Sequence, residues 1–274
     1  MRALIFLLAC TLAGCADLSP QTRWRHADTL ADQAGWMKLI IPTGDFNLAA
    51  YEPKHFTPSE TLTIYIEGDG LAWLSSSRPS PDPTPRNPVG LGLAIQHPLG
   101  QAVYLARPCQ YVGNEQASGC KQTYWTNGRF SAQVITASDQ AISELKQRHA
   151  ARKLVLVGYS GGGAVAALVA ARRNDIALLV TVAGNMDHQA WTSMHHVSPL
   201  DASLNPADKW RSLAAIPQRH YVGAQDEVVS RATLESYASR FPLDHRPRII
   251  EVPGFDHACC WVEQWGRLWD DARD

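Results

Sequence analysis

The stretch LVLVGYSGGGAVAAL, residues 154 to 168, constrains the fold of this chain more than any other segment. An apolar run of the kind found in buried strands ends at a serine with glycine close on both sides, and a helix-like run follows. A tight turn from a strand into a helix needs glycines, because they leave room for the turn and for close packing of the helix. The pattern predicts that Ser160 lies in a strained turn, with its hydroxyl above the carboxyl end of a strand.

Strands and helices alternate along most of the chain. Residues 36–42 and 47–53 suggest a short hairpin, and 61–68 suggest a third strand. Further strands are predicted at 102–106, 153–157, 177–182, 219–222 and 248–252. Helices are predicted at 88–96, 131–150, 162–173, 230–241 and 259–270. This order predicts an α/β fold, with a mostly parallel central sheet, an N-terminal antiparallel hairpin and helices on both faces.

The length of 274 residues, 45% of them hydrophobic, suits one large domain, which we place at residues 36–274. Two segments interrupt the alternation. The Pro-rich SSSRPSPDPTPRNP is predicted to be a surface loop near the site. An insertion at about 185–217, after the sixth strand, is predicted to form a small lid or substrate-binding element, the alternative being a structureless surface excursion.

The N-terminus has the features of an export signal. Residues 1–14 combine a positive start, a short apolar run and small residues, and the run is too short to span a bilayer as a mature helix. The sequence Leu-Ala-Gly-Cys ending at Cys15 resembles the lipobox of bacterial lipoproteins, which implies lipidation of Cys15. Ala16 in place of aspartate favours the outer membrane, facing the periplasm, and residues 15–35 are predicted to be a tether. The alternative is an ordinary cleaved signal with an incidental cysteine.

Export to an oxidising compartment favours disulfides. Four cysteines remain beyond the N-terminus, and Cys109 and Cys120, which flank a polar loop, are the preferred pair among the three possible pairings. The adjacent Cys259 and Cys260 could form a vicinal disulfide, a redox-active pair or two buried thiols, and we expect buried thiols. No set of ligands with zinc-like spacing accompanies them, so no metal site is predicted.

A serine hydroxyl is a poor nucleophile until a base accepts its proton and a third group orients that base. Downstream of Ser160, Asp226 follows a predicted strand and His257 follows the last one. With G-x-S-x-G at residues 158–162, the order Ser, Asp, His at strand ends resembles the α/β-hydrolase fold over residues 36–270, and is similar to exported, lipoprotein-type members. Asp187, after the preceding strand, is the rival acid.

The resemblance implies a serine hydrolase that cleaves carboxylic esters without a cofactor, with Ser160, His257 and Asp226 as its catalytic triad. Gly161 would supply one oxyanion-hole amide. Asp69 is assigned the second, with Gly70 as the next candidate, although relatives often carry His-Gly at this loop. The Asp69 carboxylate must therefore point away from the oxyanion or pair with a cation, for which Arg107 and Arg129 are candidates.

Composition narrows the partners. A formal net charge of −1 and a sequence pI near 6.8 argue against nucleic-acid binding. The expected partners are a small-molecule or lipid ester and, through the lipid anchor, a membrane. A peptidase or amidase with the same triad and a non-catalytic envelope-binding lipoprotein remain alternatives, and a lipase or phospholipase is a narrower form of the esterase hypothesis.

Three tryptophans are predicted to lie on the core-facing side of the last helix: Trp261, Trp265 and Trp269. Three others are candidates for lining an apolar pocket: Trp73, Trp125 and Trp191.

Overall fold

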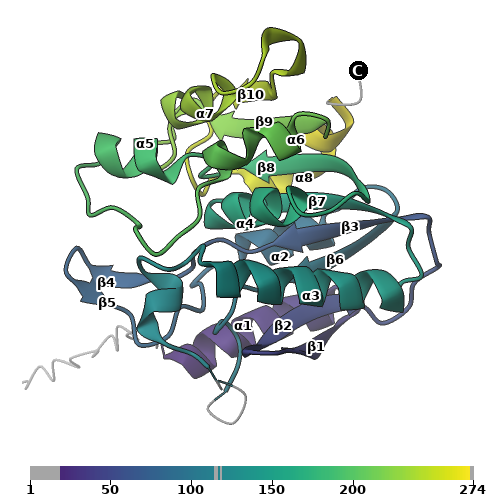
Figure 1. Ribbon diagram of the computed structural model, residues 1–274. Coiled ribbons are helices and arrows are strands. Elements are labelled where there is room, and N and C mark those ends of the chain that lie inside the picture. The colour runs from purple at the N-terminus through teal and green to yellow at the C-terminus, as the bar shows by residue number, and fades with distance from the viewer. Residues whose placement is uncertain (1–18, 114–116, 118, 272–274) are drawn as a thin grey trace, which may run out of the picture.

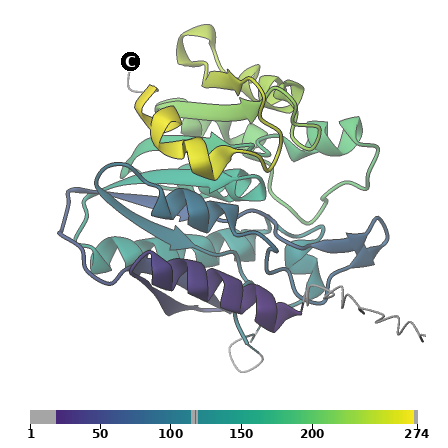
Figure 2. The same ribbon diagram turned by 180° about the vertical axis from the view of Figure 1, so that it is seen from behind.

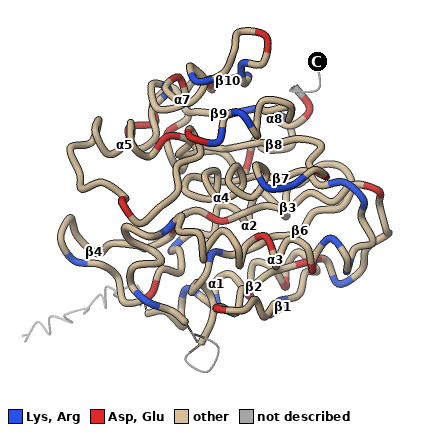
Figure 3. The backbone as a smooth tube through the Cα atoms, viewed as in Figure 1, with Lys and Arg blue, Asp and Glu red and all other residues tan. Residues whose placement is uncertain are grey.

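A computed structural model describes residues 19–113, 117 and 119–271 (Figure 1). The expected signal segment and the lipidation site at Cys15 lie outside these residues. Within the described part of the chain, no helix is long and apolar enough to cross a membrane. Positive and negative side chains are interspersed along the backbone (Figure 3).

An eight-stranded mixed sheet runs through the molecule in the order β1-β2-β6-β3-β7-β8-β9-β10. The antiparallel hairpin β1–β2 forms one edge and β2 also pairs antiparallel with β6, whereas all the other neighbours are parallel. The strands are β1 (Trp36–Thr43), β2 (Phe46–Pro53), β3 (Thr61–Ile66), β6 (Gln101–Leu105), β7 (Lys153–Tyr159), β8 (Ile176–Val182), β9 (Gln218–Gly223) and β10 (Arg248–Val252). The predicted α/β architecture with its N-terminal hairpin is confirmed.

The central strands are apolar on both faces because helices cover both sides of the sheet. In β3, Ile64 lies between Leu156 of β7 and Val103 of β6, and all three side chains are fully buried. The helices are α1 (Pro20–Gln33), α2 (Val89–Ile95), α3 (Ala132–Arg148), α4 (Gly161–Ala170), α5 (His188–Met194), α6 (Trp210–Leu213), α7 (Arg231–Ala238) and α8 (Trp261–Asp271). Helices α3, α4 and α7 contribute to one core cluster, and α1, α2 and α8 to the other, on the face seen in Figure 2.

The last helix buries its aromatic side as predicted. Trp261 and Trp265 are fully buried, and Trp265 Nε1 donates a 2.7 Å hydrogen bond to the Tyr65 hydroxyl. Trp269 is partly buried and packs against the same cluster. These side chains are therefore structural.

Helix α1 corrects the prediction that residues 15–35 form a tether. Ser19 caps its N-terminus by accepting from Thr22 N–H, and Ala27 and Ala31 face the sheet. The buried Arg23 forms a hydrogen bond with the Thr84 carbonyl and lies 3.4 Å from the Asp82 carboxylate. The segment looked like a tether because its buried side is small and includes an arginine, so it lacks a strong apolar stripe.

The two predicted interruptions carry short elements of their own. The Pro-rich segment begins within a two-stranded hairpin, β4 (Trp73–Ser75) and β5 (Arg78–Pro79), which projects from the body of the molecule (Figure 1). The 185–217 insertion contains α5 and α6, joined by a segment with one 3-10 turn at Pro206–Lys209. Both segments contribute residues to the pocket described next.

Candidate active site

The serine lies at the turn that the sequence predicted. Strand β7 ends at Tyr159, α4 begins at Gly161, and Ser160 between them has φ 50° and ψ −122°. Positive φ is uncommon for a residue other than glycine and marks a strained backbone. A Cβ atom on Gly158 would lie 2.3 Å from the Gly162 carbonyl oxygen, and one on Gly162 would lie 2.3 Å from the Ile66 carbonyl oxygen. Glycine is therefore required on both sides of the serine.

The structure brings Ser160, His257 and Asp226 together. Ser160 Oγ lies 3.0 Å from His257 Nε2, and His257 Nδ1 lies 2.9 Å from Asp226 Oδ2. Asp226 follows β9 and His257 follows β10, so three parallel strands deliver the three groups to one edge of the sheet. The Asp226 side chain is fully buried, whereas the His257 side chain is 20% exposed, as a base that must reach a substrate requires.

Further contacts orient the acid and the base. Asp226 Oδ1 accepts from the backbone N–H groups of Val228 and Val229, at 2.9 and 2.8 Å, so the carboxylate is held by its own turn. The His257 carbonyl accepts from the Tyr159 hydroxyl at 3.0 Å, which links the histidine turn to the end of β7. The imidazole therefore has a fixed position relative to the serine.

The rival acid, Asp187, has other partners. It caps α5 by accepting from Ala190 N–H, and it also accepts from the side chains of Asn205 and Ser236. It has no contact with His257, so the geometry favours Asp226.

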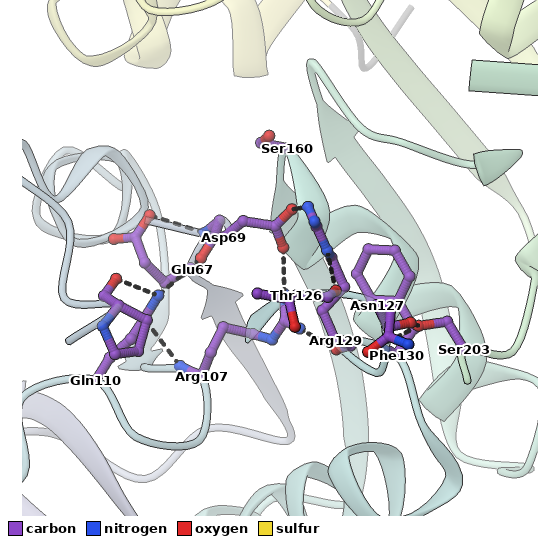
Figure 4. A network of polar contacts seen from close by, with 12 residues as sticks. Glu67, Asp69, Arg107, Gln110, Thr126, Asn127, Arg129, Phe130, Ser160 and Ser203 are labelled. Carbon is purple, nitrogen blue, oxygen red and sulfur yellow. Dashed lines mark hydrogen bonds and ion pairs between the residues drawn. The ribbon is translucent and has the colours of Figure 1, made fainter. Parts of the chain in front are cut away.

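Asp69 and Gly161 line the same pocket as Ser160. The Asp69 carboxylate lies against Gly161, since a Cβ atom there would be 2.1 Å from Asp69 Oδ1. The carboxylate pairs with Arg107 Nη1 at 3.2 Å and with Arg129 Nη1 at 2.6 Å (Figure 4). Burial acts to raise the pKa of Asp69, but the two guanidinium groups outweigh it and hold that pKa below its ordinary value. The cation pairing expected for Asp69 is therefore present, with both candidate arginines.

The strand end before Asp69 is tied down by buried hydrogen bonds. Glu67 Oε1 accepts from Gly68 N–H at 2.9 Å and from Gly90 N–H at 3.2 Å, and Tyr104 donates to Oε2. Burial raises the pKa of Glu67 to about 7. Gln110 donates from Nε2 to the Gly68 carbonyl at 3.0 Å. Sequence reasoning missed the role of both side chains. The only nearby sequence features were the apolar run before Glu67 and Cys109, which precedes Gln110.

The pocket above Ser160 has a volume of about 430 Å³. Trp73 and Trp191, two of the three candidate tryptophans, line it. Trp125 does not: it is buried elsewhere and donates to the Ser80 carbonyl at 2.9 Å. The Pro-rich loop contributes Arg86, so its predicted position near the site is confirmed.

The cysteines follow one prediction and contradict another. Cys109 and Cys120 form a disulfide, as expected. Cys259 and Cys260 were expected to be buried thiols, but Cys259 is exposed, Cys260 is half-buried, and the two form a disulfide. The pair lies in the largely exposed turn between His257 and the start of α8. Among the described residues, no group of three or more His, Cys, Asp or Glu side chains could hold a metal ion.

No family model matches this chain, and no curated protein matches it by sequence. Solved structures do match it by fold. Est1E from Butyrivibrio proteoclasticus superposes with a TM-score of 0.60 at 14% identity, covering 86% of this chain and 97% of its own. The Pyrococcus furiosus esterase Pf2001 gives a TM-score of 0.58 at 14% identity, over 86% and 88% of the two chains.

A third match is an α/β serine hydrolase without a lid from Xanthomonas campestris. Its TM-score is 0.56 at 14% identity, over 87% of this chain and 94% of its own. The shared feature is a mostly parallel sheet covered by helices on both faces. The chain described here therefore has the α/β-hydrolase fold.

Proposed function

We propose that the protein is a serine hydrolase that cleaves carboxylic esters through an acyl-enzyme. The observation that carries this proposal is the 3.0 Å approach of Ser160 Oγ to His257 Nε2, with Asp226 on the other ring nitrogen. A serine in a strained turn, within hydrogen-bond reach of an oriented imidazole, is an arrangement that activates a hydroxyl as a nucleophile.

In the first half-reaction, Ser160 Oγ attacks the ester carbonyl carbon while His257 Nε2 accepts the hydroxyl proton. The negative charge that develops on the carbonyl oxygen is stabilised by the backbone N–H groups of Gly161 and Asp69. The C–O bond to the alcohol then breaks, and the alcohol leaves with the proton from His257. Asp226 keeps the imidazole in the required tautomer and stabilises its cation.

In the second half-reaction, a water molecule gives a proton to His257 and attacks the acyl carbon of the ester on Ser160. The second tetrahedral intermediate collapses, the serine oxygen takes the proton back, and the carboxylic acid is released. Every proton in this cycle passes through His257 Nε2, so no cofactor is needed.

The test is labelling of the protein, without its signal, by a fluorophosphonate probe, followed by assays on p-nitrophenyl esters of increasing acyl length. Wild type should react with the probe and hydrolyse esters, and Ser160→Ala should do neither. Ser143→Ala, on the exposed side of α3, is the matched control and should behave as wild type. A folded wild type that neither reacts nor turns over any ester would contradict the proposal and favour a non-catalytic binding protein. Turnover of amides in preference to esters would favour an amidase.

We also propose that the chain is exported and anchored through a lipid on Cys15, on the outer membrane facing the periplasm. The lipobox-like sequence supports this proposal, and Cys15 lies four residues before the cap of α1. Metabolic labelling with an alkyne fatty acid should mark the wild type and not Cys15→Ser. Absence of label on an exported wild type would point instead to an ordinary cleaved signal.

A further inference from the structure

Three side chains that line the pocket carry N–H groups without a hydrogen-bond partner among the described residues. Arg86 is exposed and forms no hydrogen bond or ion pair there. Arg129, 8% exposed, uses Nε on the Thr126 carbonyl and Nη1 on Asp69, which leaves Nη2. Asn185, 7% exposed, has no side-chain partner, and its Oδ1 is fully buried. The Arg86 guanidinium, Arg129 Nη2 and Asn185 Nδ2 are thus available as donors at one pocket, which suits a ligand with acceptors, whereas the buried Asn185 Oδ1 is an unpaired acceptor.

One of the charged side chains around these donors has no partner of opposite charge. Two carboxylates line the pocket, and both have partners: Glu67 accepts from backbone amides and a tyrosine, and Asp69 is held between two arginines. Of the two lining arginines, Arg129 is already paired with Asp69, whose other oxygen is held by Arg107 outside the lining. Arg86 is therefore the lining arginine with no counter-ion among the described residues, and it makes the potential near its guanidinium positive.

The loop that carries Arg86 is held in place by the rest of the fold. Thr84 Oγ1 accepts from Trp24 Nε1 and from Tyr111 N–H, both at 3.0 Å, and the Pro83 carbonyl accepts from Leu71 N–H at 3.0 Å. Prolines flank Arg86 closely on both sides, which restricts the backbone further. An arginine on such a support is positioned for recognition before the ligand arrives.

Apolar side chains line much of the rest of the pocket, including Trp73, Trp191 and Val228. A ligand that fits both parts has an apolar portion next to the scissile bond and an acceptor-rich, negatively charged end. A guanidinium group suits carboxylate or phosphate in this role, because its donors match their oxygens in pairs.

We propose that the pocket selects esters that carry an anionic group, a carboxylate or a phosphate, and that Arg86 is the residue that determines this preference, with Arg129 and Asn185 as neighbouring donors. The proposal rests on the proposed esterase function for its catalytic consequence. The binding part stands on the pocket alone, so the two can fail separately.

The first experiment compares two substrates of the same shape. Mono-4-nitrophenyl adipate carries a terminal carboxylate, and 4-nitrophenyl 6-methylheptanoate is its neutral counterpart. Wild type should show a kcat/KM about tenfold higher for the anionic ester, and the ratio should fall as salt screens the charge. Arg86→Gln should remove the preference by lowering kcat/KM for the adipate alone. Arg78→Gln, an exposed arginine on β5 outside the pocket, is the matched control and should keep it.

The second experiment does not depend on turnover. Binding of the same two esters to Ser160→Ala is measured at equilibrium, with and without Arg86→Gln. Tighter binding of the adipate that is lost with Arg86→Gln supports the subsite even if wild type proves inactive and the esterase proposal fails. Equal affinity for the two esters, or an equal loss for both on Arg86→Gln, overturns the subsite even if wild type is an active esterase.

A third pair of ligands separates the two sources of negative charge. Binding of a 1-acylglycerol 3-phosphate to Ser160→Ala is compared with that of the 1-monoacylglycerol with the same chain. An Arg86-dependent advantage in this pair as well as the adipate pair indicates a general anion site. An advantage in one pair assigns the site to phosphate or to carboxylate. An advantage in neither overturns the proposal.

Discussion

The two sides of the pocket are built differently. One side, here called the anchored wall, consists of residues 67–73, 85–87 and 129, and buried hydrogen bonds and ion pairs fix it. The other side, the open wall, consists of Asn185, Trp191, Val228 and Val229. Val228 is 44% exposed, and Trp191 is held to it by one hydrogen bond from Nε1 to the Val228 carbonyl, at 2.6 Å.

The two walls differ in how much displacement the proposed chemistry tolerates. The proposed oxyanion amides belong to the anchored wall and to the adjoining start of α4. There, a displacement of the amides by about one ångström would greatly lower the rate. The open wall presents mostly apolar surface, which adapts to ligands of different shape at little cost. Substitutions should therefore act through the rate on the anchored side and through substrate affinity on the open side.

The largest effect is expected where the anchored wall meets α4. In Gly161→Ala, the new methyl group would lie 2.1 Å from Asp69 Oδ1, so the carboxylate or the helix start must move. We expect kcat to fall by about a thousandfold, comparable to the loss of an oxyanion donor. Gly266→Ala in α8 is the control, because nothing lies within 4 Å of its Cβ position, and it should stabilise the fold by about 1 kcal/mol. Near-normal turnover by Gly161→Ala would mean that the anchored wall is less rigid than its contacts suggest.

Removing one arginine from the Asp69 cluster should come next. Arg129→Met leaves the Asp69 carboxylate with one cation and removes the hydrogen bond to the Thr126 carbonyl. Because Arg107 still pairs with Asp69, the loss should be that of unsatisfied buried acceptors, about 1 to 3 kcal/mol by chemical denaturation. Arg172→Met, an exposed arginine whose guanidinium bonds to the Thr136 hydroxyl, should change stability by less than about 0.5 kcal/mol. Equal losses in the two variants would mean that the cluster is not a special support.

Glu67 should give the anchored wall a pH dependence. Its pKa is about 7 in the folded chain against an ordinary value of 4.5, so the unfolded chain releases the proton first. Glu67 therefore adds to the free energy of unfolding at low pH. This stabilisation declines as pH rises from about 4.5 to 7 and changes little above that. Between pH 5 and 8 the decline is about 2 kcal/mol. Thermal unfolding followed by circular dichroism should show this decline in wild type and a flatter profile in Glu67→Gln. Identical profiles would show that Glu67 does not titrate in this range.

The smallest effect is expected on the open wall. Trp191→Ala removes an apolar contact from the pocket and one hydrogen bond to Val228. We expect KM for a medium-chain ester to rise about three- to tenfold with kcat nearly unchanged, since an apolar contact adds about 1 to 2 kcal/mol to binding. Leu243→Ala, at an 82% exposed site, should leave both constants as in wild type. A large fall in kcat for Trp191→Ala would place part of the rate-determining geometry on the open wall.

The sequence was most informative where one local rule governed the structure. Parallel strands covered on both faces are apolar along their length, so residues 153–157 and 177–182 were recognisable as strands, which the structure extends to Lys153–Tyr159 and Ile176–Val182. The glycines around Ser160 and the placement of His257 after a strand follow from the same kind of local constraint. Three strand ends then bring the site residues together with little dependence on loop details.

It was least informative where contacts join distant loops. Arg86 and Gln110 lie in irregular segments. Their positions depend on hydrogen bonds to Thr84 and Gly68, which no local sequence periodicity predicts. Helix α1 was missed for a related reason, since its arginine is buried only because the Pro-rich loop supplies acceptors for it. The partners of Asp69 could be named as candidates, but only the fold brings both within reach.

The position of α1 has a structural consequence. Through Arg23 and Trp24, the helix is bonded to Asp82 and Thr84, in the loop that presents Arg86 to the pocket. If the chain is anchored through Cys15, the anchor lies just before α1, whose first turns contact this loop and whose later turns contact the β1–β2 hairpin through Asp28. Deleting residues 19–35 should therefore weaken the preference for anionic esters as Arg86→Gln does. An anchor at Cys15 would therefore be linked, through α1, to the loop that carries Arg86.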